Sequence, residues 1–202
     1  MGNVFVTSLR AAAVTIVLTG VAYPLVVTAI AQVAFARKAD GSLVADRDGT
    51  IVGSELIGQS FTNPAYLQGR PSAAGQGYDA AASSGSNLGP TSKALRDRVT
   101  AAAEKLRAEN PAAPGPVPAE LVTASASGLD PHLSPESALW QVPRIAAARR
   151  VSADRVRAVV LELFEGRDLG LLGEPRVNVL AVNLALDGRF GRPAGGANIP
   201  PK

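Results

Sequence analysis

The chain has 202 residues, a net charge of +3 at pH 7, no cysteine and one histidine. The lack of cysteine excludes disulfide bonds, thiolate metal sites and cysteine nucleophiles, and a single histidine excludes a multi-histidine metal site within one chain. No run of Lys and Arg with interleaved aromatic residues occurs, so the basic balance is assigned to a solvated surface and no nucleic-acid partner is expected.

An apolar stretch of 26 residues without a charge, Ala11 to Ala36, lies between Arg10 and the pair Arg37-Lys38. As a helix rising about 1.5 Å per residue it would be about 39 Å long, enough to cross a hydrocarbon core of about 30 Å. About 165 residues follow, which gives room for one compact domain. The predicted order is a short cytoplasmic N-terminus, a transmembrane helix, an extracytoplasmic domain and a mobile tail: 1–10, 11–36, 37–190 and 191–202.

Two features of this stretch leave alternatives open. Ala34-Phe35-Ala36 has the small-x-small form of a signal-peptidase site, although the apolar region of a signal is usually only about 7 to 15 residues long. Arg10 precedes the stretch, whereas Arg37, Lys38 and Arg47 follow it, so the positive-inside count favours a cytoplasmic C-terminal domain. A helix buried in a soluble core would need a large domain around it.

Pro24 near the middle of the stretch removes one backbone hydrogen bond, which a membrane helix tolerates mainly where neighbouring helices or local adjustment satisfy the freed carbonyl. Gly20 would allow another helix to approach closely, and Tyr23 adds an amphipathic ring. We therefore predict that the span docks against partner helices as well as anchoring the chain.

After the span, Leu43–Ala45 and 50–52 flank an Asp-Gly pair, which predicts a hairpin in which Gly49 takes a positive φ. Residues 53–92 are rich in Gly, Ser and Ala, with little that favours a regular helix or strand. Phe61, Tyr66 and Tyr78 occur in this segment, and such aromatic content favours a long ordered loop over a disordered linker.

The second half of the chain alternates helix signals with turns. A helix is predicted from the N-cap Ser92 to Pro111, followed by an extended connector over 111–118, a strand over 120–125 and a turn over 128–131. Ser134 caps a helix with Pro135 at its first position, and Pro143 breaks or restarts it. A helix from Ser152 to Gly166 and a buried strand over 177–186, with a short helix near Asn183 as an alternative for its second part, complete the prediction. The fold class is therefore one N-terminal transmembrane helix followed by an α+β domain.

The candidate chemistry is weak. Asp130, His132 and Ser134 are close in sequence, but no G-x-S-x-G elbow is present, and a turn followed by a helix cap explains the same residues. Residues 85–93 could cradle an anion ahead of a helix, but Lys93 does not directly follow the second glycine of a P-loop pattern. Gln141, Arg144 and the pair Arg149-Arg150 are expected to be polar groups of a surface or an interface.

Several long motifs resemble the C subunit of the bacterial Kdp potassium-transporting P-type ATPase, over residues from about 10 to 187. The motifs are TGVAYP at 19–24, GSELIGQSF at 53–61, GRPSA at 69–73, SSGSNLGP at 83–90, ELVTASASGLDPH at 120–132, Ser134-Pro135 and QVPR at 141–144. The connector 111–118 and the tail 191–202 depart from the family pattern.

The resemblance implies a single-span subunit of the bacterial inner membrane with its N-terminus inside and its domain outside the cytoplasm, contrary to the charge count. The implied partners are a channel-like potassium-translocating subunit, a P-type ATP-hydrolysing subunit and a small stabilising peptide. It also implies a catalytic-chaperone role that raises the ATP affinity of the pump subunit, beside a role in assembly or ion entry. No tightly bound cofactor or metal is expected; ATP would act through the pump subunit, and potassium is the transported ion.

This interpretation assigns the chain no catalytic residue, because the phosphorylated Asp-Lys-Thr-Gly-Thr motif of the pump does not occur in it. The alternatives from other classes are a membrane-anchored extracytoplasmic hydrolase and a lone anchored adaptor. The predicted partner-binding residues are Gly20, Tyr23, Pro24, Gly69, Arg70, Pro71, Ser72, Gly85, Ser86, Asn87, Asp130, His132, Gln141, Pro143 and Arg144.

Overall fold

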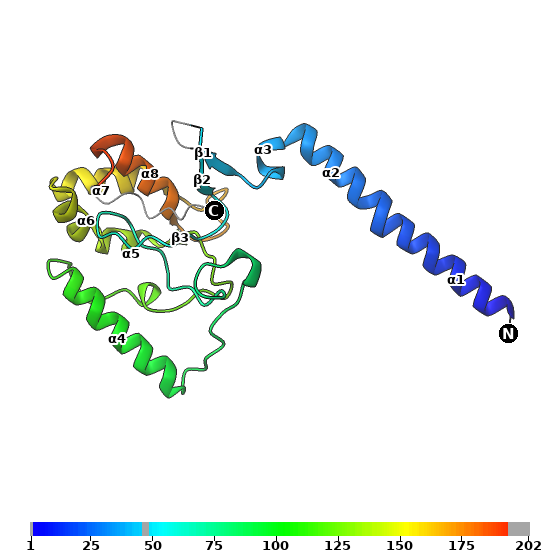
Figure 1. The fold of residues 1–202 in the computed structure, drawn as a ribbon, viewed down its shortest axis with the longest axis horizontal. Helices are drawn as coiled ribbons and strands as arrows, with labels where there is room; N and C mark the ends of the chain where they lie inside the picture. Colours follow the sequence, from blue (N-terminus) through cyan, green and yellow to red (C-terminus); the bar gives the residue numbers. More distant parts are fainter. Residues whose placement is uncertain (1, 46–48, 194–202) are drawn as a thin grey trace. The chain divides into compact units, whose positions relative to one another are not determined.

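A computed structural model of the chain describes residues 2–45 and 49–193 (Figure 1). The chain divides into two units, Met1–Leu43 and Val44–Lys202, which are described separately. The predicted turn residues 46–48 and most of the predicted tail, 194–202, lie outside the described residues.

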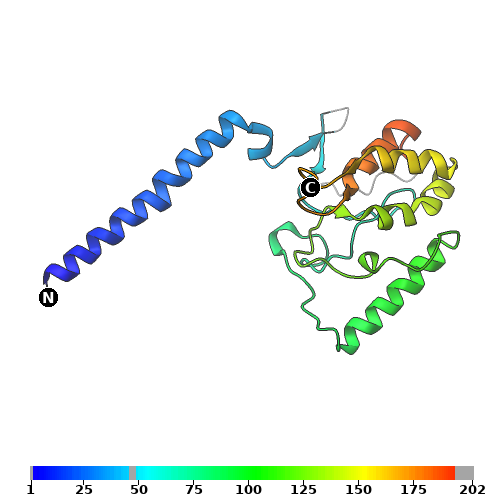
Figure 2. The ribbon, with the colours of Figure 1, turned by 180° about the vertical axis from the view of Figure 1, so that it is seen from behind.

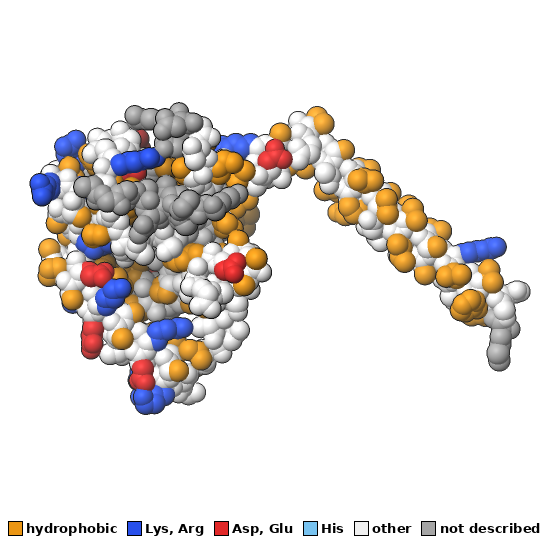
Figure 3. Space-filling model, viewed as in Figure 1, with side chains coloured by type: hydrophobic (Ala, Val, Ile, Leu, Met, Phe, Trp, Pro, Cys, Tyr) orange, Lys and Arg blue, Asp and Glu red, His pale blue; other side chains and the backbone are white. Residues whose placement is uncertain are grey.

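The first unit is helical, and its helix Gly2–Ala34 is long and apolar enough to cross a membrane. Hydrophobic side chains cover this helix along its length (Figure 3). None of the side chains of α1 and α2 is buried. This confirms the long apolar N-terminal helix. The helix begins before Arg10, so the limits of the membrane-embedded part, 11–36, stay a prediction. Its elements are α1 (Gly2–Ile16), the π-helical turn η1 (Val17–Ala22), α2 (Tyr23–Ala34) and α3 (Ala36–Ala39).

The second unit mixes helices with short strands, as predicted. β1 (Leu43–Ala45) and β2 (Ile51–Ser54) form one two-stranded sheet, and Gly49 between them has φ +78°. A three-stranded sheet has the order β3-β5-β4 and is antiparallel throughout. The remaining elements are η2 (Ala80–Ala82), α4 (Lys93–Glu109), η3 (Ala119–Leu121), β3 (His132–Leu133), α5 (Pro135–Trp140), α6 (Val142–Arg149), α7 (Ala153–Glu162), β4 (Phe164–Glu165), β5 (Arg176–Asn178) and α8 (Val179–Phe190).

The core of this unit lies among α5 to α8 and β5, whereas α4 lies on the opposite side of the domain (Figure 2). Ile145, Val156 and Leu186 are fully buried there. No residue of α4 is fully buried. The aromatic residues Phe61 and Tyr66, from the segment before α4, are packed into the same core, with ring centroids 5.8 Å apart.

The predicted starts of three helices are correct, and two of them have the predicted serine cap. The Ser92 and Ser134 hydroxyls accept backbone hydrogen bonds from Leu95 and Ser137, and α7 begins directly after Ser152. Such caps satisfy backbone donors that the first helical turn leaves unpaired, which is why short sequence patterns locate them.

Three predicted elements are wrong. The strand predicted over 177–186 ends already at Asn178, whose side chain accepts from Ala181 N and caps α8, and the helix expected near Asn183 covers Val179–Phe190. Residues 120–125 contain the 3-10 turn η3 instead of a strand, and Glu120 turns its carboxylate to Ser134. The helix predicted to end at Gly166 ends at Glu162, since the next residues pair with β5.

Candidate partner-binding surface

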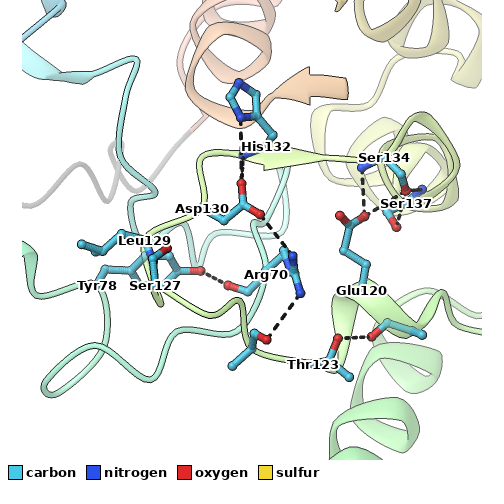
Figure 4. A network of polar contacts seen from close by, with 12 residues as sticks. Arg70, Tyr78, Glu120, Thr123, Ser127, Leu129, Asp130, His132, Ser134 and Ser137 are labelled. Atoms are coloured by element: carbon cyan, nitrogen blue, oxygen red, sulfur yellow. Dashed lines mark hydrogen bonds and ion pairs between the residues drawn. The ribbon is translucent and has the colours of Figure 1, made fainter. Parts of the chain in front are cut away.

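Three loop segments that are far apart in sequence lie side by side in the second unit. We call residues 69–72, 83–87 and 124–132 the composite loop surface. Arg70 joins the first segment to the third: its Nη1 lies 3.1 Å from Asp130 Oδ2, and its Nη2 donates to the carbonyl oxygen of Ala124 at 3.4 Å (Figure 4). The side chains of Arg70 and Asp130 are 23% and 30% exposed, so the ion pair is at the surface and only partly screened by water.

Hydroxyl groups and glycines hold the segments at backbone contact. Ser72 Oγ donates to Gly128 O at 2.6 Å, and Ser83 Oγ donates to Ser127 O at 2.9 Å. Gly128 has φ +67°, and a Cβ added there would lie 2.6 Å from Ser84 O. A Cβ on Gly85 would lie 2.8 Å from Ala126 O. The glycines of these motifs are therefore required by the close approach of two backbones.

Tyr78 holds residues 70–72 in place through two hydrogen bonds. Its Oη donates to Arg70 O at 2.6 Å, and its backbone N–H donates to Ser72 Oγ at 2.7 Å. The Tyr78 phenol is protonated at neutral pH and can donate, and burial raises its pKa further.

The Asp130, His132 and Ser134 side chains do not form a proton-transfer chain. His132 Nδ1 lies 3.9 Å from Asp130 Oδ1, whereas Ser134 Oγ donates to Glu120 Oε2 at 2.9 Å and caps α5 (Figure 4). Asp130 Oδ1 also accepts from the backbone N–H of His132 at 3.0 Å, which is an Asx-type turn. The interpretation of this trio as a turn followed by a helix cap is confirmed.

Gln141 and Arg144 are buried, 1% and 6% exposed, so neither is a group of the free surface, and their role at an interface stays a prediction. Gln141 pairs with both backbone groups of Gln68: Oε1 accepts from the N–H at 3.0 Å, and Nε2 donates to the carbonyl at 2.9 Å. Arg144 Nη2 donates to Tyr66 O at 3.1 Å and to Gln141 Oε1 at 2.7 Å. Burial lowers the pKa of the Arg144 guanidinium to about 10, while the nearby Glu109 carboxylate acts in the opposite direction.

Asn183 of α8 completes this arrangement by pairing with both backbone groups of Leu67, at 2.7 Å and 2.9 Å. We call Gln141, Arg144 and Asn183 the backbone clamp, because together they satisfy the irregular backbone of residues 66–68. The extended segment has no strand partner, so buried side chains supply the hydrogen bonds that a sheet would otherwise provide.

Comparison with known proteins identifies the family to which this chain belongs. Residues 5–188 match the family described as "KdpC: K+-transporting ATPase, c chain". The chain is 63% identical over 191 residues to a potassium-transporting ATPase KdpC subunit of Myxococcus xanthus, covering 95% of this chain and 90% of that one. The chain belongs to the KdpC family. KdpC subunits of Methylobacterium nodulans and Rhodospirillum rubrum are each 57% identical to it, covering 87% and 86% of this chain and 92% and 89% of their own lengths.

The motifs that carried the resemblance to KdpC proteins have two different locations in the second unit. Gly69, Arg70, Ser72, Gly85 and Asp130 belong to the composite loop surface, where Pro71, Ser86, Asn87 and His132 accompany them. Gln141 and Arg144 belong to the buried backbone clamp, and Pro143, half-buried, begins α6.

Residues of both the composite loop surface and the backbone clamp line a cavity of about 250 Å³. It is lined by residues of α4 and of the loop, among them Gly69, Pro71 and Gln141. Small-molecule sites usually have about 300 to 1,000 Å³, so this cavity falls below their range. Among the described residues, no group of three or more His, Asp or Glu side chains is arranged to hold a metal ion.

The remaining predicted residues of the KdpC motifs, Gly20, Tyr23 and Pro24, lie in the apolar helix of the first unit. Tyr23 N–H donates to Leu18 O, five residues earlier, so the helix widens into a π turn directly before Pro24. Proline cannot donate and crowds the preceding turn, and the π turn is the local adjustment. Tyr23 is 67% exposed within this unit.

The sequence did not identify several residues that organise the KdpC-family domain. Asp187 of α8 accepts from Tyr66 Oη at 2.8 Å and forms an ion pair with Arg149, also at 2.8 Å. Asn183 and Gln68 were likewise missed. Each pairs with a partner more than 70 positions away, and no short pattern encodes such a contact.

Proposed function

We propose that the chain is a non-catalytic accessory subunit of an ATP-driven high-affinity potassium uptake complex. Its partners would be a channel-like potassium-translocating subunit, a P-type ATP-hydrolysing subunit and a small stabilising peptide. Family membership over residues 5–188 supports this proposal, and so do the names of the close relatives.

The main support for the proposal is that the polar side chains of the family motifs form hydrogen bonds and ion pairs within the domain itself. Arg70, Ser72 and Asp130 hold two loops together, and Gln141 and Arg144 satisfy buried backbone. Groups engaged in this way shape a surface, whereas catalysis would need an acid, a base or a nucleophile aimed at a common point. The composite loop surface is therefore proposed to bind partner subunits.

The apolar helix is proposed to cross the bacterial inner membrane once, with the N-terminus inside and the second unit outside the cytoplasm. The chain has no native cysteine, so a single Ala101→Cys variant on the exposed side of α4 reports the location of this unit. We expect labelling by a membrane-impermeant maleimide in intact spheroplasts. Labelling only after lysis would place the unit in the cytoplasm.

A catalytic-chaperone role, raising the ATP affinity of the pump subunit, remains part of the proposal beside assembly or ion entry. With the second unit outside the cytoplasm, such an effect would have to reach the pump subunit through the span or the other subunits. Comparing the KM for ATP of the complete complex with that of a complex carrying a variant span tests this route.

The decisive experiment compares Arg70→Met with His132→Ala in the purified complex. Arg70→Met removes the ion pair that joins two loops, so we expect the variant chain to be under-represented among the co-purifying subunits. His132→Ala should leave the potassium-stimulated ATP turnover of the assembled complex near wild type, because no proton transfer is assigned to that imidazole. Loss of turnover in the His132 variant at normal subunit ratio would contradict the non-catalytic role.

A further inference from the structure

Three leucines project from the turn that joins β4 to β5. We call residues 164–178 the leucine hairpin and residues 169–172 its tip. Leu169, Leu171 and Leu172 are 91%, 81% and 62% exposed, although leucine is usually among the most buried residues. Phe164, at the base of the hairpin, is also exposed, with 44% of its surface accessible. A cluster of exposed apolar side chains of this kind marks a surface that binds another protein or a membrane.

The charged residues of the hairpin are confined to its stem and compensate one another. Arg167 forms an ion pair with Glu174 at 2.8 Å. Arg176 pairs with Glu165 at 2.8 Å and lies 3.7 Å from Asp168. Two arginines thus face three carboxylates, and residues 169–173 carry no charge. The stem offers no net attraction to anionic headgroups, while the tip is purely apolar.

Several backbone N–H groups at the tip are paired within the hairpin. Asp168 N–H donates to Leu172 O at 2.8 Å, and Leu172 N–H donates back to Asp168 O at 2.9 Å. Leu171 and Gly170 donate to Asp168 O and Arg167 O at 3.2 Å and 3.1 Å. Unpaired backbone groups make an irregular loop costly to place in lipid, and three N–H donors of this tip and that of the adjacent Asp168 are already paired.

The stem of the hairpin lies close to the part of the domain that follows the membrane helix. Asn178, the last residue of β5, donates from Nδ2 to Glu55 O at 2.9 Å. Glu55 directly follows β2, which pairs with β1, where the second unit begins.

The chain length between the two units limits how far this part can be from the bilayer. The apolar helix ends at Ala34 and the second unit begins at Val44, so the nine residues 35–43 join them. Even fully extended, the ten Cα-to-Cα steps from Ala34 to Val44 span at most about 35 Å. We infer that the tip of the leucine hairpin inserts into the interfacial region of the lipid bilayer that holds the apolar helix.

Site-directed spin labelling tests this in the full chain, because the protein has no cysteine to remove. Leu171→Cys would carry a nitroxide, and Ala101→Cys on the exposed side of α4 would carry the control label. The full chain is reconstituted in phosphatidylcholine vesicles, and collision with oxygen is compared with collision with a water-soluble nickel chelate. We expect several-fold higher oxygen preference at 171 than at 101.

Adding phosphatidylglycerol to the vesicles should leave this preference unchanged, since the stem has no excess of positive charge. A second variant, Leu169→Asp with Leu172→Asp in the Leu171→Cys background, should return the label to water. Fluorescence of the single, buried Trp140 verifies that the domain is still folded.

Three results would overturn the inference. The label at 171 could be as accessible to the nickel chelate as the label at 101, or it could stay in lipid after both aspartates are introduced. It could also be aqueous in vesicles and become protected only in the assembled complex, in which case a protein surface covers the tip.

Discussion

The side-chain amide of Asn183 makes both backbone hydrogen bonds of Leu67, with Oδ1 accepting at 2.7 Å and Nδ2 donating at 2.9 Å. Leu67 is fully buried, and its backbone has no strand beside it. The Asn183 amide thus makes the hydrogen bonds that a neighbouring strand would otherwise make, although it is 116 residues away from Leu67 in the sequence.

Asn183→Ala should be strongly destabilising, because it leaves a buried N–H and a buried carbonyl unpaired at about 1 to 3 kcal/mol each. Urea unfolding of the full chain in detergent, followed by Trp140 fluorescence, measures the loss. Gln76→Ala at an exposed loop position is the matched control and should change stability by less than about 0.5 kcal/mol. Equal stability of the two variants would contradict the role assigned to Asn183.

Arg144→Ala separates a structural role from an interface role for the backbone clamp. It removes the donor to Tyr66 O and to Gln141 Oε1 from a buried site, so the isolated chain should lose about 1 to 3 kcal/mol. The same unfolding measurement is made without any partner subunit. Unchanged stability together with lost assembly would instead mean that Arg144 acts at an interface.

Tyr66 should make stability depend on alkaline pH. Burial, followed by the hydrogen bond to Asp187 and the charge of Asp187, raises the pKa of Tyr66 from 10 to about 12. The unfolded chain loses this proton near pH 10 and the folded chain only near pH 12, so the stabilising contribution is complete below pH 10 and lost as the pH rises to 12.

The comparison with Tyr66→Phe isolates that effect, since the charges of all other groups change equally in both proteins. The free energy of unfolding of the wild type relative to the variant should fall between pH 10 and 12, by up to about 3 kcal/mol. A difference that stays constant across this window would show that the phenol is not preferentially protonated in the folded chain.

Gly128→Ala should disturb the composite loop surface. The new Cβ would lie 2.6 Å from Ser84 O and 2.7 Å from Ala74 N, at a φ of +67° that alanine disfavours. We expect reduced recovery of partner subunits with a tagged Gly128→Ala chain. Gly89→Ala is the control, because a Cβ there meets nothing within 4 Å. Normal assembly of the Gly128 variant would argue against this surface as the docking site.

Pro24→Ala should close the π turn of the apolar helix into a regular α-helix, because alanine restores the missing N–H donor. Side chains before Val17 would then rotate by about 100° relative to those after Ala22, one α-helical step. If this helix docks on partner helices, disulfide cross-links to partner subunits from single cysteines at 11–16 should shift to a different face, while those at 25–30 keep theirs. An unchanged pattern on both sides would contradict a docking role for the turn.

The sequence predicted correctly those features that depend on residues close together in the chain. The apolar span and the caps at Ser92 and Ser134 depend on neighbouring residues, so short patterns located them. The run 177–186 was misassigned because apolar residues buried on several sides have no clear period, and the Asn178 cap decided in favour of a helix.

The candidate surface was predictable only in part. The resemblance to KdpC proteins selected Arg70 and Asp130, but nothing in their spacing indicates that they form an ion pair across 60 residues. It also selected Gln141 and Arg144 without indicating that they are buried. Burial follows from the packing of α6 against the loop, which a pattern of neighbouring residues does not contain.

The position of Asn183 and Asp187 near the C-terminal end has a consequence for biosynthesis. The segment around Tyr66 is made long before α8, yet the backbone of Leu67 and the phenol of Tyr66 acquire their partners Asn183 and Asp187 only when α8 is present. A growing chain therefore inserts its apolar helix while the domain is still open. The domain can close only after translation of nearly the whole chain, so a ribosome that stalls before residue 183 would leave an anchored, unfolded product for membrane proteases to remove.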